Sequence, residues 1–190
     1  MSKRKLGFCI TGSFCTFEKA FVQMEALREE YDILPILSYH AASLDTRFGK
    51  AQEHIRRIEE ICGKRVIATI PEAEPIGPKG YTDIMLVAPC TGNTLAKLAN
   101  SIVDTPVTMA VKSHLRNARP VVVAVSTNDA LSGSAKNIGA LQNYKHYYFV
   151  PYRQDNYKGK PTSIVADFSK IGETLSLAWE NRQIQPMVLS

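Results

Sequence analysis

One short segment near the start of the chain has the composition of a phosphate-binding loop. Thr11-Gly12-Ser13 follows an apolar run and precedes a helical pattern. Gly12 lets the backbone turn sharply, and the free N–H groups at the start of the following helix can hold a phosphate. The alternative is a simple turn between a strand and a helix. The G-x-G-x-x-G spacing of dinucleotide sites is missing, which disfavours NAD(P) in that binding mode and leaves a mononucleotide open.

A second segment, Ala88 to Thr108, could accept a flat ring. It reads APCTGNTLAKLANSIVDTPVT and begins at the end of an apolar run. Small side chains let a ring approach the backbone, and the amide of Asn93 can both donate and accept hydrogen bonds. Thr91 or Thr94 can cap the helix that follows, and the alternative is that capping is their only role.

A third group could bind a carboxylate. Ser126, Thr127 and Asn128 end the apolar run VVVAV, and the turn KSHLRNARP before it carries Lys112, His114, Arg116 and Arg119. Arginine binds carboxylates through two parallel hydrogen bonds, which makes Arg116 a candidate. The alternative for the basic turn is a solvated surface loop.

Strand-like and helical patterns alternate along the chain and must position these segments. Apolar runs predict strands at 6–11, 33–38, 66–70, 84–88, 107–111, 121–125 and 147–150. Apolar residues three and four apart predict helices at 17–31, 48–62, 95–102, 138–141 and 164–178. Residues 71–80, PEAEPIGPKG, contain three prolines and are expected to be an irregular connection.

This alternation predicts βαβ units and a three-layer α/β/α domain, 1–190, with a parallel sheet of about six strands. In such sheets ligands bind at the carboxyl ends of the strands, where loops enter helices. The three polar segments should therefore meet at one edge of the sheet, together with Ser38 at the end of the second strand.

Composition narrows the function classes. The chain has 190 residues, 45% hydrophobic and 22% charged, as expected for a globular protein. A net charge of +5 without a basic run is compatible with anionic small molecules and does not by itself indicate nucleic acid. Four cysteines without a C-x-x-C pair predict neither a metal site nor a disulfide framework. No apolar run is long enough to cross a bilayer, so we expect a soluble, cytoplasmic protein.

The same segments resemble the flavoprotein superfamily of flavin-dependent cysteine decarboxylases and flavin prenyltransferases. Ala88 to Thr108 resembles its "PASANT" segment, and Gly7 to Ser13 resembles its opening G-I-T-G-S loop. KSHLRNARPVVVAVSTND and KPTSIVADFSKI resemble further segments. The resemblance implies a flavodoxin-like, Rossmann-type subunit with FMN at a contact between subunits, in a homo-oligomer such as a trimer or dodecamer.

Site residues follow from the loops and the resemblance together. Asn128 falls where the decarboxylases use an Asn to hold a substrate carboxylate, so Asn128 and Arg116 are the predicted substrate-binding residues. Catalytic residues are left unassigned, and no metal is expected. The predicted cofactor-binding residues are Thr11, Gly12, Ser13, Ser38, Pro89, Cys90, Thr91, Asn93, Thr94, Ser126 and Thr127.

Within the superfamily, essentially the whole chain resembles the family of dipicolinate synthase B subunits from spore-forming bacteria. PEAEPIGPKG, APCTGNTLAKLAN, HLRNARPVVVAVSTND and AKNIGAL carry this resemblance. It implies an oxidoreductase-type subunit that works with an A subunit resembling an NAD(P)-binding dehydrogenase. The pair would convert dihydrodipicolinate or hydroxytetrahydrodipicolinate, a small dicarboxylate, into dipicolinate during sporulation, in the mother-cell cytoplasm.

The chain departs from the other branches of the superfamily. Phosphopantothenoylcysteine decarboxylases carry a catalytic His where this chain reads IGPKGYTDIML, and no cysteine follows position 90. Cysteine decarboxylation is therefore not expected. Ser126-Thr127-Asn128-Asp129 stands where prenyltransferases have Arg-Glu-Thr-Pro, although residues 152–153 and 161–162 echo their phosphate-binding tail. Prenyl transfer stays open as an alternative, as does a non-catalytic, flavin-binding scaffold for the A subunit.

Overall fold

The computed structural model describes residues 3–190, so residues 1 and 2 of the predicted domain 1–190 lie outside it. One sheet contains the strands β1 (Arg4–Ile10), β2 (Tyr31–Leu37), β3 (Ile84–Cys90), β4 (Val121–Thr127), β5 (Tyr147–Phe149), β6 (Tyr152–Asn156) and β7 (Lys160–Ala166). The α-helices are α1 (Phe17–Leu27), α2 (Tyr39–Ser43), α3 (Ala51–Cys62), α4 (Ile70–Ala73), α5 (Gly92–Ala99), α6 (Pro106–Leu115), α7 (Ala135–Asn143) and α8 (Ile171–Trp179). Three 3-10 turns complete them: η1 (Phe14–Thr16), η2 (Glu74–Ile76) and η3 (Phe168–Lys170).

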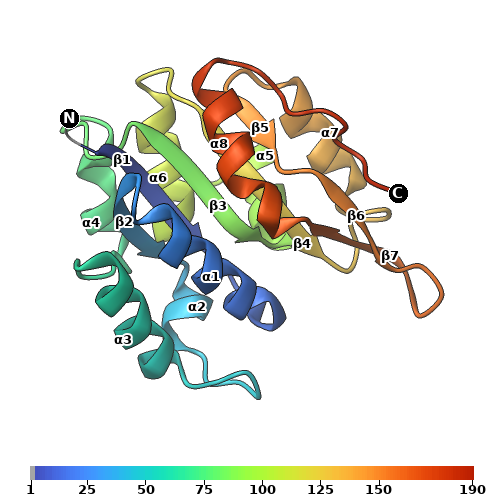
Figure 1. The fold of residues 1–190 in the computed structure, drawn as a ribbon, viewed down its shortest axis with the longest axis horizontal. Coiled ribbons are helices and arrows are strands. Elements are labelled where there is room, and N and C mark those ends of the chain that lie inside the picture. Colours follow the sequence, from blue (N-terminus) through green and yellow to red (C-terminus); the bar gives the residue numbers. More distant parts are fainter. Residues whose placement is uncertain (1–2) are drawn as a thin grey trace.

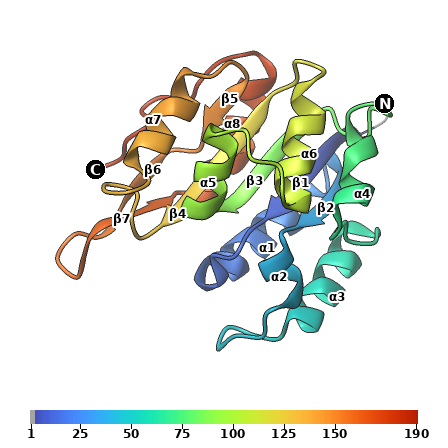
Figure 2. The same ribbon diagram turned by 180° about the vertical axis from the view of Figure 1, so that it is seen from behind.

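Five strands are parallel, in the order β2-β1-β3-β4-β5. This is the flavodoxin-like order, with its switch point between β1 and β3. Helices α1 and α8 cover one face of the sheet (Figure 1), and α5, α6 and α7 cover the other (Figure 2). The predicted α/β/α flavodoxin-like fold is confirmed. The strands β6 and β7 form an antiparallel hairpin that was not predicted, and β7 pairs with the carboxyl end of β4 through Ser126 and Thr127.

The central strands are buried on both faces. Every residue of β3 is buried, and residues 121–125 of β4 are 0% exposed. Helices on both sides of a parallel sheet shield such strands from water, which explains their unbroken apolar sequences. Burial on both faces leaves only the strand ends for polar ligand contacts.

Two predicted strands are not strands. The predicted strand 107–111 lies inside α6, which begins with Thr105 and Thr108 in a capping box and Pro106 in the first turn. These are helix-start signals that outweigh the β-branched residues of the run. The predicted strand 66–70 contributes a single bridge, from Ile67 to Ile36 of β2.

The predicted terminal helix is too long at its beginning. Ile164 belongs to β7, and α8 begins only at Ile171. Pairing with β6 and with the end of β4 holds residues 160–166 as a strand, and such long-range pairing is not visible in a local apolar period. The proline-rich stretch is also more regular than expected, since Pro71 lies in the first turn of α4, where proline is tolerated.

Candidate ligand-binding site

Two adjacent cavities lie where the carboxyl ends of β1 to β4 meet, at the switch point of the sheet. The larger, about 700 Å³, includes Ser13, Ser126, Thr127 and Asn128 in its lining. The smaller, about 450 Å³, includes Thr11, Ser38, Asn93 and Thr94. Gly12 and Thr91 line both. The structure therefore brings ten of the predicted residues together at the carboxyl ends of the strands. The other three, Pro89, Cys90 and Arg116, line neither cavity.

Pro89 and Cys90 lie beneath the cavities as part of β3. The Pro89 carbonyl accepts a hydrogen bond from Thr11 Oγ1 at 2.8 Å. Cys90 is 0% exposed, and this burial raises the pKa of its thiol. A buried, protonated thiol is a packing group. These two residues support the site without lining it.

A hydroxyl network ties the loop after β1 to the loop after β3. Thr11 Oγ1, which donates to Pro89, also accepts from the Thr91 N–H at 3.0 Å. Thr91 Oγ1 accepts from the Thr94 N–H at 3.3 Å and caps α5. Because the Thr11 hydroxyl is engaged both as donor and as acceptor, its structural role is to fix the position of the two loops relative to each other.

Gly12 is not required by the backbone, in contrast to the expectation of a sharp glycine turn. The glycines with left-handed φ angles are Gly49, Gly63 and Gly80. A Cβ added to Gly12 would meet a ring carbon of Phe14 at 3.6 Å and Cβ of His40 at 3.7 Å, which are ordinary contacts. The fold itself would tolerate a side chain here, so the bare backbone between the two cavities is open to a ligand.

The helical segment after this loop begins without a side-chain cap. Neither Ser13, which precedes η1, nor Thr16, which precedes α1, makes a capping hydrogen bond. The Ser13 hydroxyl instead bonds Ser126 Oγ at 2.8 Å. Uncapped backbone N–H groups at a helix start are compatible with the predicted anion site.

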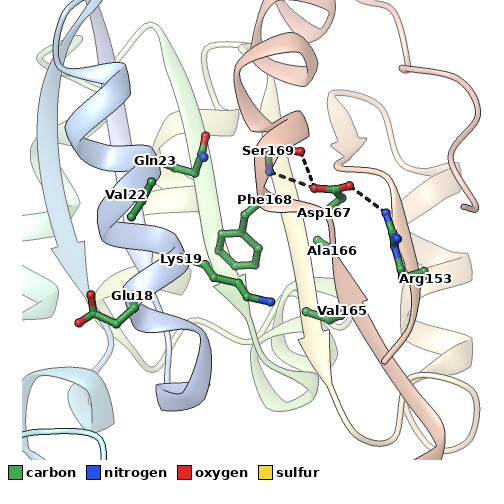
Figure 3. Close-up of a pocket in the computed structure, with 10 residues that line it drawn as sticks. All are labelled: Glu18, Lys19, Val22, Gln23, Arg153, Val165, Ala166, Asp167, Phe168 and Ser169. Carbon is green, nitrogen blue, oxygen red and sulfur yellow. Dashed lines mark hydrogen bonds and ion pairs between the residues drawn. The ribbon is translucent and has the colours of Figure 1, made fainter. Parts of the chain in front are cut away.

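Two lysines that were not predicted from the sequence border the larger cavity. Lys160 Nζ pairs with Asp155 at 2.8 Å, whereas Lys19 makes no ion pair within residues 3–190. Lys19 also lines a neighbouring pocket of about 600 Å³, where its side chain extends from α1 toward Val165 of β7 (Figure 3). The sequence signal was weak, because Lys19 lies on a helix face and Lys160 in the unpredicted hairpin.

The other cation of the neighbouring pocket is neutralised. Arg153 donates to Asp167 at 2.9 Å, and Asp167 also accepts from the Ser169 hydroxyl at 2.6 Å (Figure 3). The hydrogen bond from Ser169 is the main cause of the lowered pKa of Asp167. Lys19 is therefore the cation of this pocket without a carboxylate partner in the described part of the chain.

The basic turn lies at the opposite edge of the sheet, so its predicted position near the ligand is wrong. Arg116 is exposed and ends α6, five residues before β4 begins. His114 Nε2 donates to the Pro120 carbonyl at 3.1 Å, and Arg119 contacts Asp83 and the Thr82 carbonyl just before β3. The predicted strand 107–111 produced the error, because a helix there places the turn at the amino ends of β3 and β4.

Apolar groups complete the larger cavity. Phe14, Phe48, Ile164 and Val165 line it beside the hydroxyls. Apolar walls with a few polar groups are typical of sites for flat organic ligands. In residues 3–190 no group of three His, Cys, Asp or Glu side chains could hold a metal ion. The described helices include none with the length and apolarity to span a membrane.

Comparison with known proteins gives the family. The sequence profile of the flavoprotein family matches residues 1–175. The chain belongs to the flavoprotein family. This flavoprotein is 41% identical over 187 residues to the B subunit of dipicolinate synthase of Bacillus subtilis (strain 168), which covers 98% of the chain and 94% of that relative. The predicted family is thus confirmed.

Solved structures give the same fold. The dipicolinate synthase B subunit from Bacillus halodurans C superposes with a TM-score of 0.90 at 40% identity, covering 98% of this flavoprotein and 96% of that chain. Burkholderia xenovorans DmrB in complex with FMN, described as a cubic protein cage for redox transfer, has a TM-score of 0.67 at 19% identity. The superposition covers 92% of this flavoprotein and 94% of the DmrB chain. At that identity the similarity shows a shared fold.

The residues present fit a flavin. The larger cavity combines apolar walls with hydroxyls, and the bare backbone at Gly12 admits a close approach. The uncapped start of η1 and α1 suits a phosphate.

Proposed function

We propose that this flavoprotein is the B subunit of a two-subunit dipicolinate synthase. With an A subunit that binds NAD(P), it would convert dihydrodipicolinate or hydroxytetrahydrodipicolinate into dipicolinate during sporulation, in the cytoplasm of the mother cell. The observation that carries the proposal is the 41% identity to the B subunit of dipicolinate synthase across 98% of the chain. The active unit is a homo-oligomer that acts together with its A-type partner.

FMN is the proposed cofactor. Its phosphate would lie against the uncapped N–H groups after Gly12, and its ring beside Ser126, Thr127 and the apolar wall. Ser38, Asn93 and Thr94 of the smaller cavity are available for the polar chain between them. A bound flavin supplies a two-electron acceptor for hydride removed from the substrate ring. The protein supplies orientation and shields the reacting atoms from water.

The substrate is a small dicarboxylate and needs positive charge. Lys19 and Lys160 border the larger cavity and take the role predicted for Arg116. Lys19, which has no carboxylate partner in residues 3–190, would pair with one substrate carboxylate. Asn128 is exposed at the rim and would donate a hydrogen bond to the same ligand.

The cofactor claim has a direct test. Protein purified without added flavin, or titrated with FMN, should show a flavin absorption spectrum and release unmodified FMN by mass spectrometry. Incubation with a prenyl phosphate should leave the FMN mass unchanged, whereas a prenylated mass would support the transferase alternative. A colourless protein that binds no added FMN would contradict the proposal.

The scaffold alternative is supported by one observation: the carboxylate lining the larger cavity, Asp155, is exposed and paired with Lys160. No buried carboxylate or histidine in residues 3–190 lines that cavity as an obvious acid or base. The variants Asn93→Ala and Asn128→Ala separate the two functions. Unchanged dipicolinate formation by the assembled complex would favour the scaffold, and a strong decrease favours the enzyme.

A further inference from the structure

The hydroxyl of Thr127 has a fixed polarity. Thr127 lines the larger cavity, and its Oγ1 donates a hydrogen bond to Asp129 Oδ1 at 2.6 Å. The second oxygen, Asp129 Oδ2, accepts from Ser134 Oγ at 2.9 Å. A hydroxyl has one proton and two lone pairs. Any hydrogen bond between Thr127 Oγ1 and an occupant of the cavity must therefore be one that Thr127 accepts.

The start of α5 packs tightly against this arrangement. A Cβ on Gly92 would lie 2.7 Å from Asp129 Oδ1, 2.8 Å from Thr127 Oγ1 and 2.6 Å from Ser134 Oγ. The three side chains therefore fill the space over the first residue of the helix. This packing restricts rotation of the Asp129 carboxylate and keeps it as the acceptor for Thr127.

A donor lies at the neighbouring position. Ser13 Oγ and Ser126 Oγ bond each other at 2.8 Å, which uses one of their two protons. The other proton can be donated to an occupant, in competition only with the long contact of 3.9 Å from Ser13 Oγ to Cys15 Sγ. The larger cavity therefore combines an accepting hydroxyl at Thr127 with a donating hydroxyl in the serine pair. An amide-like ring edge, with a C=O beside an N–H, complements both groups, whereas a carboxylate complements only the donor.

We propose that Asp129 is a positioning residue that makes Thr127 a hydrogen-bond acceptor, so that the larger cavity selects a flavin whose ring edge carries an N–H. The inference rests on the proposed function, because it assigns the flavin ring edge to this part of the cavity. The substrate dicarboxylate would then bind at the side of the cavity that is bordered by Lys19 and Lys160.

The test compares FMN with FMN methylated at its imide nitrogen, titrated into the flavin-free full-length protein and followed by flavin fluorescence. Wild-type protein should prefer FMN by about tenfold, because the methylated ring leaves the Thr127 acceptor unpaired. The methyl group also adds bulk, so the informative quantity is the change in this ratio among variants. Thr127→Val keeps the side-chain shape and should lower the ratio several-fold, mainly by weakening the binding of FMN.

Asp129 is tested by rescue. In Asp129→Ala the Thr127 proton is free to turn into the cavity, so the preference for FMN should be largely lost. Asp129→Asn keeps an oxygen for Thr127, with its amide donating to Ser134, and should retain most of the preference. Ser176→Ala is the control, because Ser176 is exposed on α8, donates only to the Gly172 carbonyl and is not among the residues that line either cavity, so its ratio should match wild type.

The outcomes separate the inference from the function on which it rests. A wild-type ratio that persists in Thr127→Val, or equal affinities of wild-type protein for the two flavins, would overturn the role of Thr127 and Asp129 while the flavin site stands. Wild-type protein that binds neither flavin would overturn the proposed function itself. A ratio that falls several-fold in Thr127→Val and in Asp129→Ala, while Asp129→Asn keeps most of the wild-type preference for FMN, supports the positioning role even if one variant is less stable.

Discussion

Replacing Gly12 by alanine should separate the folding of the chain from its ligand binding. In the free protein, the new Cβ would lie 3.6 Å from a ring carbon of Phe14 and 3.7 Å from Cβ of His40. Gly12 is not among the glycines with left-handed φ angles. The free energy of unfolding should therefore stay within about 1 kcal/mol of the wild-type value, and a small increase is expected from the stiffer unfolded chain.

Binding should respond differently, because Gly12 lines both cavities. A methyl group crowding a fitted ligand costs about 1–3 kcal/mol, which corresponds to an FMN affinity lower by roughly fivefold to 150-fold. Thermal unfolding of the flavin-free protein and fluorescence titration with FMN measure the two effects. Gly139→Ala is the matched control: a Cβ there meets nothing within 4 Å, so it should keep FMN affinity. Unchanged FMN affinity in Gly12→Ala would refute a ligand that lies over this backbone.

Three further predictions concern other parts of the fold. Gly77→Ala should lower the free energy of unfolding in urea by about 2 kcal/mol or more, because its Cβ would overlap the backbone carbonyl of Ser113. Burial lowers the pKa of His114 to about 4. As the pH falls, His114 is therefore protonated in the unfolded chain before it is protonated in the folded protein. The free energy of unfolding should therefore fall as the pH drops from about 6.5 toward 4, and less steeply in His114→Gln. Arg116→Ala should leave dipicolinate formation by the assembled complex unchanged, whereas Lys19→Ala should raise KM for the dicarboxylate; the opposite pattern would contradict the corrected position of the basic turn.

The sequence was sufficient to place most of the site because one topological rule governs it. Apolar runs identified β1, β3 and β4. The residues that follow these strands meet at the switch point because the strands are parallel and adjacent, regardless of the conformation of each loop. Thr91 and Ser126 could therefore be assigned to one edge. The roles within the site were not predictable: the Thr11 hydroxyl is engaged by Pro89 and Thr91, which depends on loop geometry that no spacing encodes.

The errors share a cause in long-range contacts. The run from Val107 to Val111 suits a strand locally, and a Thr-Pro start makes it a helix, which moved Arg116 to the far edge. The hairpin of β6 and β7 depends on pairing with the end of β4, a contact between residues nearly 40 positions apart in sequence. Because the hairpin was missed, Lys160 and the apolar wall at Ile164 were missed with it.

We propose that this flavoprotein is a required, FMN-binding partner in dipicolinate formation, and one reconstitution tests this most directly. The purified A-type partner, the dihydrodipicolinate or hydroxytetrahydrodipicolinate precursor and NAD(P) should be combined with and without this chain, and dipicolinate measured by its ultraviolet absorbance. We predict dipicolinate only when the FMN-loaded chain is present. The same rate of formation by the A-type partner alone would contradict the proposed function.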